Sequence, residues 1–599
     1  MHKNLNNLEI AELLRAVAAA YKLKGQSENK FRIVAYERAA DAVEHASSEL
    51  KDLWDEGKLD DIPGIGKSIA EHLDEIFRNG KSKHFEEVMK GLPPAMFELM
   101  KVPGIGAKTS FKLTRELGIK DSKNAISQLE KAVKKGKVRN IEGFGEQSEE
   151  SLEKSIKETK ERTVRIILPY AQKIADDIIA WVKNDKNVQR ADALGSLRRK
   201  ASTVGDIDIA ASSKNPIETI NHFTKYPNAT RVLEKGERTA GIIVAGGKQV
   251  DLMVEKPEAY GALLQHFTGS KHHNIALREL ALKRNLSLSD YGIYFKTKNR
   301  KTLKKIETEE EFYKTLGMDW IPPELREDTG EIDMALKHNL PDLVQLSEVK
   351  ADLQIHSSFD IETSHDLGES SMEEVINKAN SLGYEYVAFT EHNPSKSGHN
   401  ETQTVEILKR KCEKVDKINY SLRTASARNE LRRVKKVFNS LEIDILPNGK
   451  LPVSDKGMET LDFALVSIHS SFRQNRVDMT RRVLSAMSHP KVKIFAHPTG
   501  RKLGAREGID LDWEKIFDFC LKNNKWLEIN ADPMRLDLPD FLVRDAVKLG
   551  VKLTFGTDSH HIDSMDNMVF GVSVARRGWA TKKDIVNTLS LEDFEKVLK

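Results

Sequence analysis

Cysteine is almost absent from this chain, which has two, Cys412 and Cys520, among 599 residues. Two cysteines exclude a disulfide framework and are typical of a reducing compartment, so we expect a cytoplasmic protein. Long apolar runs are also missing, and we therefore expect no membrane partner. The first residues are charged and amphipathic, with Ile10 and Leu14 on one face, which does not indicate a signal peptide.

A large excess of one sign of charge is missing as well, because 95 basic and 91 acidic residues leave a net charge of only +4, which says little about partners. A length of 599 residues exceeds what a single core organises, so we expect three to five domains. Basic residues cluster locally, for example at 198–200 and 409–411. Taken one at a time, such clusters are explained as well by a solvated surface as by a nucleic acid.

Pairs of glycines recur three times in the first third of the chain. Each pair precedes a stretch that predicts a helix, at 67–77, 107–117 and 146–156. The pairs are Gly64 and Gly66, Gly104 and Gly106, and Gly143 and Gly145. Such a turn fits a helix-hairpin-helix, in which N–H groups at the start of a helix bind a DNA phosphate. Glycines that only cap helices are the alternative, and the threefold repetition favours DNA binding without sequence preference.

The middle of the chain carries three aspartates in a strand-rich region. The pattern predicts a short strand and a helix over 163–182 and a strand over 188–193, followed by a Gly-Ser turn. Asp206 and Asp208 are two residues apart and would share one face of the next strand. A hairpin over 241–254, turning at Gly246 and Gly247, would place Asp251 on a neighbouring strand. Three such carboxylates can hold two Mg²⁺ or Mn²⁺ ions for nucleotidyl transfer, although Asp-x-Asp alone also fits a solvated strand edge.

This region resembles the palm of the family X DNA polymerases. The resemblance implies that Asp206, Asp208 and Asp251 are the catalytic metal ligands. It also implies a DNA contact at Arg278 and nucleotide contacts at Gly195, Ser196, Arg199, Gly205, Phe267, Thr268, Gly269, Ser270 and Asn274. Two residues depart from the family pattern, because His266 replaces a usual tyrosine and Gln249 replaces a frequent arginine. The segments 291–294 and 321–326 resemble the end of the bacterial thumb domain.

The first glycine hairpin resembles the small N-terminal domain of the same family. In that family a lysine near this hairpin forms a Schiff base with an abasic sugar. Here His72 occupies the position of this lysine, and Ser68 replaces another one. An imidazole cannot form that imine, so we expect DNA binding without lyase activity unless another residue such as Lys67 serves instead.

From about residue 350 onward, short apolar runs alternate with helical stretches, and most runs end in a side chain that can bind metal. These runs are 352–356, 386–392, 441–444, 463–469, 493–497, 526–530 and 553–560. Alternating strands and helices predict parallel strands in a barrel, with a site at their carboxyl ends. Histidines mixed with carboxylates favour Mn²⁺ or Zn²⁺. Such a site predicts phosphoesterase chemistry.

This order of motifs resembles the PHP (polymerase and histidinol phosphatase) domain fused to bacterial and archaeal family X polymerases. The implied ligands of two or three ions are His356, His392, Glu442, His469, His497, Asp558 and His560. Gln354 replaces the first histidine of the family, Glu391 replaces an aspartate, and either Asp360 or Glu362 would supply a further ligand. The basic stretch 395–438 predicts helix, either as a solvated insertion or as an added DNA contact.

We therefore expect a multidomain fold with α-helical helix-hairpin-helix domains, an α+β nucleotidyltransferase palm and thumb, and a C-terminal α/β PHP barrel of the distorted TIM type. The expected domains are 1–85, 86–160, 161–255 (palm), 256–326 (thumb), 327–348 (linker) and 349–599 (PHP). The resemblance implies a monomeric DNA polymerase that fills short gaps in base excision repair, using dNTPs on gapped or nicked DNA. It further implies 3′-5′ exonuclease activity, with AP endonuclease activity left open. The alternative is a DNA-end-binding scaffold or a nuclease in which one metal site is degenerate.

Overall fold

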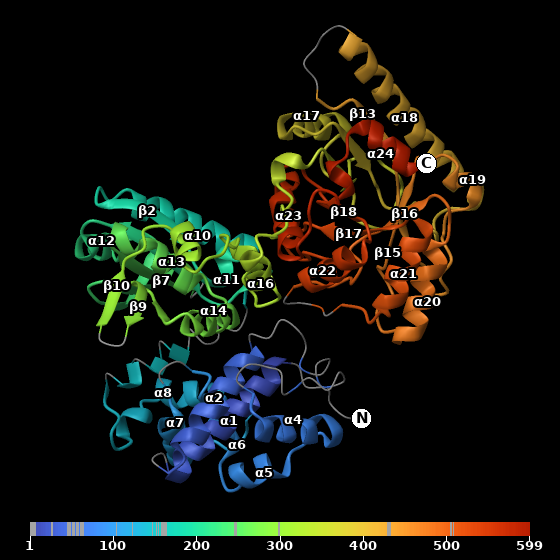
Figure 1. The fold of residues 1–599 in the computed structure, drawn as a ribbon. Coiled ribbons are helices and arrows are strands. Elements are labelled where there is room, and N and C mark those ends of the chain that lie inside the picture. The colour runs from blue at the N-terminus through green and yellow to red at the C-terminus, as the bar shows by residue number, and fades with distance from the viewer. Residues whose placement is uncertain are drawn as a thin grey trace. The chain divides into compact units, whose positions relative to one another are not determined.

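A computed structural model gives the fold of the chain (Figure 1). It describes residues 7–599 except 26–27, 45–49, 51–53, 55–58, 60–64, 103–104, 123, 147, 151, 154, 157–164, 245–247, 298–299, 428–432, 504–505 and 507. The chain divides into two compact units, one made of 1–164 with 245–248 and the other of the remaining residues. In the described part of the chain, no helix is both long and apolar enough to cross a membrane.

The first unit is helical, as the glycine pattern predicts. Its helices include α1 (Asn7–Gly25), α2 (Lys30–Glu44), α4 (Lys67–Asn79), α5 (Lys83–Met89), α6 (Pro94–Leu99), α7 (Ala107–Glu116) and α8 (Ala125–Lys134). Ile10 and Leu14 are fully buried on the inner face of α1. Both α4 and α7 begin directly after a glycine, Gly66 and Gly106, as expected. Gly64, Gly104 and the expected turn at 246–247 lie outside the described residues.

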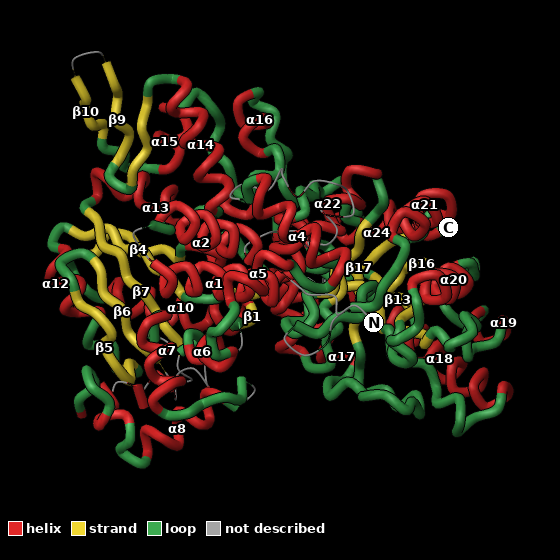
Figure 2. The backbone as a smooth tube through the Cα atoms, turned by 90° about the horizontal axis from the view of Figure 1, so that it is seen from below, coloured by secondary structure: helices red, strands yellow, loops and turns green. Residues whose placement is uncertain are grey.

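The second unit opens with a five-stranded sheet of order β2-β4-β7-β6-β5, of which β4, β7, β6 and β5 are labelled in Figure 2. Its elements are β1 (Ile166–Ile167), α10 (Leu168–Lys183), β2 (Val188–Ala193), α11 (Gly195–Arg198), β3 (Thr203–Val204), β4 (Ile207–Ser213), α12 (Pro216–Phe223), β5 (Ala229–Lys235), β6 (Thr239–Val244) and β7 (Lys248–Glu255). Ile207 and Ile209 of β4 are buried, as predicted, and the strand is buried on both faces from Ile209 to Ser213.

A smaller layer with its own core follows this sheet. It contains α13 (Tyr260–Thr268), α14 (Lys271–Lys283), α15 (Glu309–Thr315) and the antiparallel strands β8 (Leu286–Ser289), β9 (Gly292–Thr297) and β10 (Arg300–Lys304). The expected linker 327–348 is packed against its neighbours. Glu331, at the start of α16 (Glu331–Leu336), bonds buried His273 at 2.6 Å, and Val344 N–H donates to Ala580.

The remainder of the chain is α/β with parallel strands. Its strands are β11 (Ala351–Ile355), β12 (Tyr386–Phe389), β13 (Lys436–Asn439), β14 (Glu442–Asp444), β15 (Ala464–Ser467), β16 (Val492–Phe495), β17 (Trp526–Asn530) and β18 (Leu553–Gly556). Helices α17 (Met372–Leu382), α18 (Glu401–Ala427), α19 (Asp455–Met458), α20 (Arg476–Met487), α21 (Trp513–Asn523), α22 (Asp540–Leu549), α23 (Met568–Arg577) and α24 (Leu591–Leu598) complete this part.

These strands form two parallel sheets, β11-β12-β13 and β14-β15-β16-β17-β18, and among the described residues no ladder closes them into one barrel. Hydrogen bonds beyond the strand ends link the two sheets, from Asp558 N–H to Gln354 and from His356 N–H to Ser559. The predicted helix over 395–438 is also only partly correct. The last residues of this segment are not helical but belong to strand β13, which pairs in parallel with β12.

Candidate active sites

The three palm aspartates lie on or next to two neighbouring inner strands of the five-stranded sheet. Asp208 on β4 and Asp251 on β7 are direct partners in a parallel ladder, so their side chains project from the same face. Asp206 is exposed and lies one residue before β4, whereas Asp208 is half-buried. Burial and the charges of Asp251 and Asp206 raise the pKa of Asp208 to about 6. Three mutually repelling carboxylates of this kind are stabilised by a cation.

Two glycines let these carboxylates pack closely against the backbone. A Cβ at Gly195 would lie 3.0 Å from Asp208 Oδ2, and one at Gly241 would lie 2.6 Å from Asp251 Oδ1. Gly195 also has φ +56°, which glycine adopts without strain. Carboxylate oxygens grouped in this way fit Mg²⁺ or Mn²⁺, which would polarise a phosphate and a 3′-hydroxyl when bound. Gln249, which replaces a frequent arginine of the family, donates a hydrogen bond to Asp251 at 2.8 Å and so helps to orient this carboxylate.

Several of the expected nucleotide residues contact one another. Arg199, just after α11, donates through Nη1 to the carbonyl of Thr268 at 2.6 Å. Gly269 has φ +66°, and a Cβ there would lie 3.2 Å from that nitrogen. Ser270 caps α14, and Asn274 on this helix donates to the carbonyl of His266 at 2.7 Å.

The remaining expected nucleotide residues surround this group: Ser196 lies on α11, exposed Gly205 just before Asp206, and half-buried Phe267 on α13. Burial and the charge of Arg278 lower the pKa of His266, which favours a neutral imidazole there. Arg278 itself is exposed on α14, where a DNA backbone could reach it.

Helix starts in the first unit follow glycines with open surroundings. Gly66 and Gly106 are extended, and a Cβ at either would meet no atom within 4 Å. In the third repeat Gly143 has φ +82°, and Gly145 also faces open space. These conformations are compatible with helix-hairpin-helix turns, in which N–H groups at the start of a helix can bind a phosphate.

His72, at the position of the family's lyase nucleophile, lies in an aromatic cluster. Its ring stacks on that of His84 with centroids 4.3 Å apart and meets Phe85 edge-on. Burial and the charge of His84 lower the pKa of His72. These contacts give the side chain a packing role within α4.

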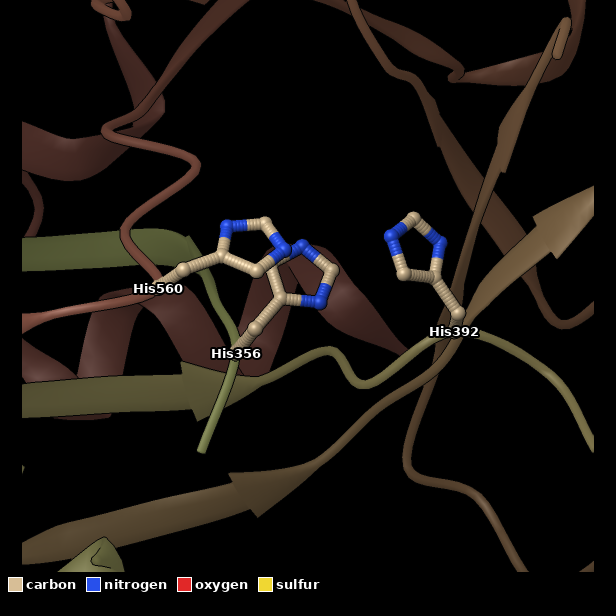
Figure 3. A group of neighbouring side chains, drawn as sticks. All are labelled: His356, His392 and His560. Atoms are coloured by element: carbon tan, nitrogen blue, oxygen red, sulfur yellow. The ribbon is translucent and has the colours of Figure 1, made fainter. Parts of the chain in front are cut away.

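The C-terminal histidines and carboxylates converge at the carboxyl ends of the parallel strands. Four overlapping groups have ligand atoms within 4.8 Å of one another: His356, His392 and His560; His365, His392 and His469; Glu442, His469 and His497; and His356, Glu442 and Asp558. Figure 3 shows the first group, with rings from three separate segments turned toward one another. All seven ligands predicted from sequence are therefore brought together.

Glu442 is the centre of this cluster. It is 1% exposed and lies 2.9 Å from His497 Nε2 and 3.2 Å from His356 Nε2. Burial alone would raise the pKa of Glu442, but the surrounding histidines hold it well below its usual range. Burial would lower the pKa of His356, and hydrogen bonds to Asp558 and Glu442 raise it to about 10. Imidazoles that are hydrogen-bonded to carboxylates in this way are typical of metal-binding sites.

The donor set fits Mn²⁺ or Zn²⁺. Within the described part of the chain, the buried Nδ1 atoms of His356 and His497 have no hydrogen-bond partner, which is costly without a further ligand. Imidazole and carboxylate donors together suit these ions better than Mg²⁺. Such ions would activate water and stabilise a phosphate leaving group when bound.

His365 is the ligand candidate that sequence reasoning missed. Its Nε2 bonds Asp444 Oδ2 at 2.8 Å, and Asp444 Oδ1 bonds His469 Nδ1 at 2.7 Å. Neither Asp360 nor Glu362, expected as the further ligand, belongs to these groups among the described residues, and Glu362 pairs with His399 and Arg410. His365 lies nine residues after His356 in an irregular segment, so no strand periodicity marks it.

Two departures from the family motif also have structural explanations. Gln354 directs its Nε2 to Glu442 at 2.9 Å and to Asp558 at 3.3 Å, and it thereby acts as a donor to two ligands. Glu391 pairs at 2.5 Å with Lys411, which is fully buried on α18. The basic helix α18 is thus anchored beneath the site through this ion pair.

A cavity of about 520 Å³ opens onto the cluster of candidate metal ligands. Basic and aromatic side chains line it beside the histidines: Phe472, Lys502, Arg506 and Arg535. Arg506 lies over the ring of Phe472, with its guanidinium carbon 4.0 Å from the ring centroid. Four carboxylates, Asp366, Glu369, Asp532 and Asp558, line it as well, so the cavity combines possible cation ligands with basic side chains that suit a phosphodiester.

Comparisons with known proteins agree with this architecture. Family models described as the DNA polymerase beta thumb and as a helix-hairpin-helix domain match residues 263–327 and 5–82. The chain is 33% identical over 601 residues to the Bacillus subtilis (strain 168) protein named DNA polymerase/3′-5′ exonuclease PolX, and the match covers 100% of both chains.

More distant matches cover about half of this chain. Rattus norvegicus DNA polymerase lambda is 22% identical over 350 residues, which span 54% of this chain and 56% of that protein. Xenopus laevis DNA nucleotidylexotransferase is 24% identical over 336 residues, which span 49% and 64%. The fold and sites define a class, namely a polymerase-type palm and thumb joined to an α/β domain with a metal-ligand cluster. Within that class, the chain belongs to the PolX family of family X DNA polymerases.

Proposed function

We propose that this chain is a DNA-directed DNA polymerase of family X that also degrades DNA in the 3′-5′ direction. The observation that carries the first activity is the parallel register of Asp208 and Asp251, whose carboxylates pack closely against Gly195 and Gly241. Mg²⁺ or Mn²⁺ held there would bring a 3′-hydroxyl and the α-phosphate of a dNTP together.

In this proposal the protein residues divide the work. Asp206, Asp208 and Asp251 hold the cations, and Arg199 binds the triphosphate through its guanidinium. The glycine turns at Gly66, Gly106 and Gly143, with the other predicted hairpin glycines, bind the backbone of gapped or nicked DNA. Binding of such DNA would allow the enzyme to fill short gaps during base excision repair. In this proposal the enzyme is a monomer and acts in the cytoplasm.

The exonuclease is assigned to the PHP domain, whose two sheets we interpret as a distorted barrel. Its eight candidate ligands include Glu442, which lies within reach of four histidines. Lys502 and Arg506 hold the phosphodiester next to the cluster. Cleavage at abasic sites is a second reaction of the same centre, whereas lyase chemistry at His72 is not proposed.

The test uses a primer on gapped duplex DNA. It measures extension of the primer with dNTPs present and shortening of its 3′ end without them. Asp206→Ala should abolish extension and leave DNA binding and shortening intact. His356→Ala with His497→Ala should abolish shortening and leave extension intact. A DNA-end-binding scaffold would show neither activity, and a nuclease with a degenerate palm would show only shortening. Substantial extension by Asp206→Ala would contradict the assignment of the palm.

Borohydride treatment with an abasic-site substrate tests the lyase separately. No covalent adduct is expected, and an adduct that disappears in Lys67→Ala would assign a lyase to that residue.

A further inference from the structure

Arg577 joins the PHP domain to the nucleotide side of the palm. It is the last residue of α23, and its side chain is only 10% exposed. One face pairs with Asp540 at 2.7 Å. Its Nη1 donates to the main-chain carbonyl of Arg199 at 2.8 Å and to Glu327 Oε1 at 3.0 Å. An arginine of one module is thus bonded to a nucleotide-binding candidate of the other.

Glu327 is shared between the two arginines. Arg199 Nε donates to the same Oε1 atom at 2.9 Å. Burial alone would raise the pKa of Glu327, but Arg199 and Arg577 lower it to about 2, so the carboxylate is ionised at neutral pH. The Arg199 guanidinium therefore has an anionic partner on the side away from the Thr268 carbonyl.

A triphosphate that binds Arg199 has to compete with this carboxylate. Arg577 also donates a hydrogen bond to Oε1 of Glu327 and neutralises part of the charge of this carboxylate. The attraction between Glu327 and Arg199 is therefore weaker than it would be without Arg577. We propose that Glu327 and Arg577 are positioning residues through which the PHP domain sets the affinity of the palm for the incoming dNTP. This inference rests on the proposed role of Arg199 in nucleotide binding.

Arg577→Gln tests the direction of the coupling. With Arg577 gone, Glu327 pairs with Arg199 alone and its full charge opposes the triphosphate. The KM for dNTP should rise about fivefold, within the range usual for coupled sites, whereas kcat should stay nearly constant because Arg577 touches no reacting atom. Arg577→Lys keeps the charge beside Glu327 and should restore most of the affinity.

Arg576 supplies a matched control on the same helix. Its Nε bonds Glu324 at 2.8 Å and its Nη1 donates to Val344 at 3.2 Å, so it also connects the modules. None of these contacts involves Arg199. Arg576→Gln should therefore weaken the interface to a similar extent and leave the KM for dNTP unchanged. An equal rise of KM in Arg576→Gln and Arg577→Gln would overturn the proposal in favour of a general loosening of the interface.

The double variant Glu327→Gln with Arg577→Gln isolates the carboxylate. In a Glu327→Gln background, removal of Arg577 should no longer change the KM for dNTP, because the charge it offsets is gone. The same fivefold rise in both backgrounds would overturn the coupling. Thermal unfolding and 3′-5′ degradation by the same samples show that each variant is folded, and if Arg577→Gln does not fold, Arg577→Ala and Arg577→Lys are compared in its place.

Arg199→Gln separates this proposal from the function on which it rests. A large rise of the KM for dNTP in Arg199→Gln, combined with no change in Arg577→Gln, would reject the coupling alone. An unchanged KM in Arg199→Gln would reject the nucleotide-binding role of Arg199 and the coupling together.

Discussion

The two candidate catalytic centres of this chain differ in how their ligands are held before a cation binds. In the palm, Asp208 and Asp251 are aligned by strand register, and their charges oppose each other. In the C-terminal α/β region, proposed above to be a PHP domain, candidate ligand carboxylates are balanced by imidazoles, as Glu442 is by His356 and His497. The palm site thus depends on the cation for its electrostatic balance, whereas the PHP site is largely balanced by its own residues.

This difference has consequences for metal choice and for regulation. A centre of hard oxygen ligands can be filled and emptied together with the Mg²⁺-bound triphosphate. A centre of buried imidazoles and carboxylates should retain its ions through many turnovers, because its ligands need little rearrangement. One chain can therefore combine a transient synthesis site with a permanent degradation site, and the predictions below test that contrast.

The largest effect is expected from Asp208→Asn. Loss of this ligand should reduce primer extension by roughly a thousandfold, since metal stabilisation of the transition state is worth several kcal/mol. Shortening of the 3′ end should stay within twofold of wild type. Asp177→Asn, an exposed aspartate on α10, is the matched control and should extend primers normally. If Asp208→Asn also slowed shortening strongly, the two centres would not be independent.

Glu442→Gln is the reciprocal change and should be somewhat milder. It removes the carboxylate that four histidines approach, so shortening should fall by roughly a hundredfold while extension is retained. Loss of bound metal, measured by elemental analysis of the purified variant, should accompany the defect. Glu413→Gln on the exposed face of α18 makes the same chemical change away from the cluster. Shortening that persists in Glu442→Gln would place the exonuclease elsewhere.

Metal selectivity should separate the centres by about tenfold, as ligand hardness predicts. After chelation and dialysis, Mg²⁺ alone should restore extension, whereas shortening should need Mn²⁺ or Zn²⁺. The measurement is a titration of each ion in the two assays on one preparation. Restoration of both activities at the same Mg²⁺ concentration would remove the contrast between the two sites.

Gln354→His should tighten metal binding in the PHP centre. The native amide donates hydrogen bonds to Glu442 and Asp558, whereas a histidine would add an imidazole donor beside them. Retention of Mn²⁺ during dialysis against a chelator should improve roughly fivefold, in line with the effect of one ligand contact. Gln354→Leu removes the amide without adding a ligand and should retain less metal than wild type.

Sequence reasoning succeeded where periodicity carries the information. Alternation of Ile207 and Ile209 with aspartates predicts the strand, and the ladder confirms the pairing of Asp208 with Asp251. His365 was missed because it lies in an irregular segment, and contact with Asp444 depends on tertiary folding. The contact of Arg577 with Glu327 spans 250 residues, a separation that no local pattern reports.

The smallest effect concerns stability without metal. Because the folded-state pKa of Asp208 is raised to about 6, ionisation of this carboxyl opposes folding. Its contribution is most favourable below the unfolded pKa near 4 and is lost as pH rises through 6. In chelator at pH 7, Asp208→Asn should therefore raise the free energy of unfolding by about 2 kcal/mol, and at pH 4 the gain should nearly vanish. Urea unfolding at both pH values measures this difference, and Glu442→Gln should instead destabilise the protein, because it leaves buried histidines without their partner. A gain in both variants would show that the PHP centre, like the palm, is held together only by its cation.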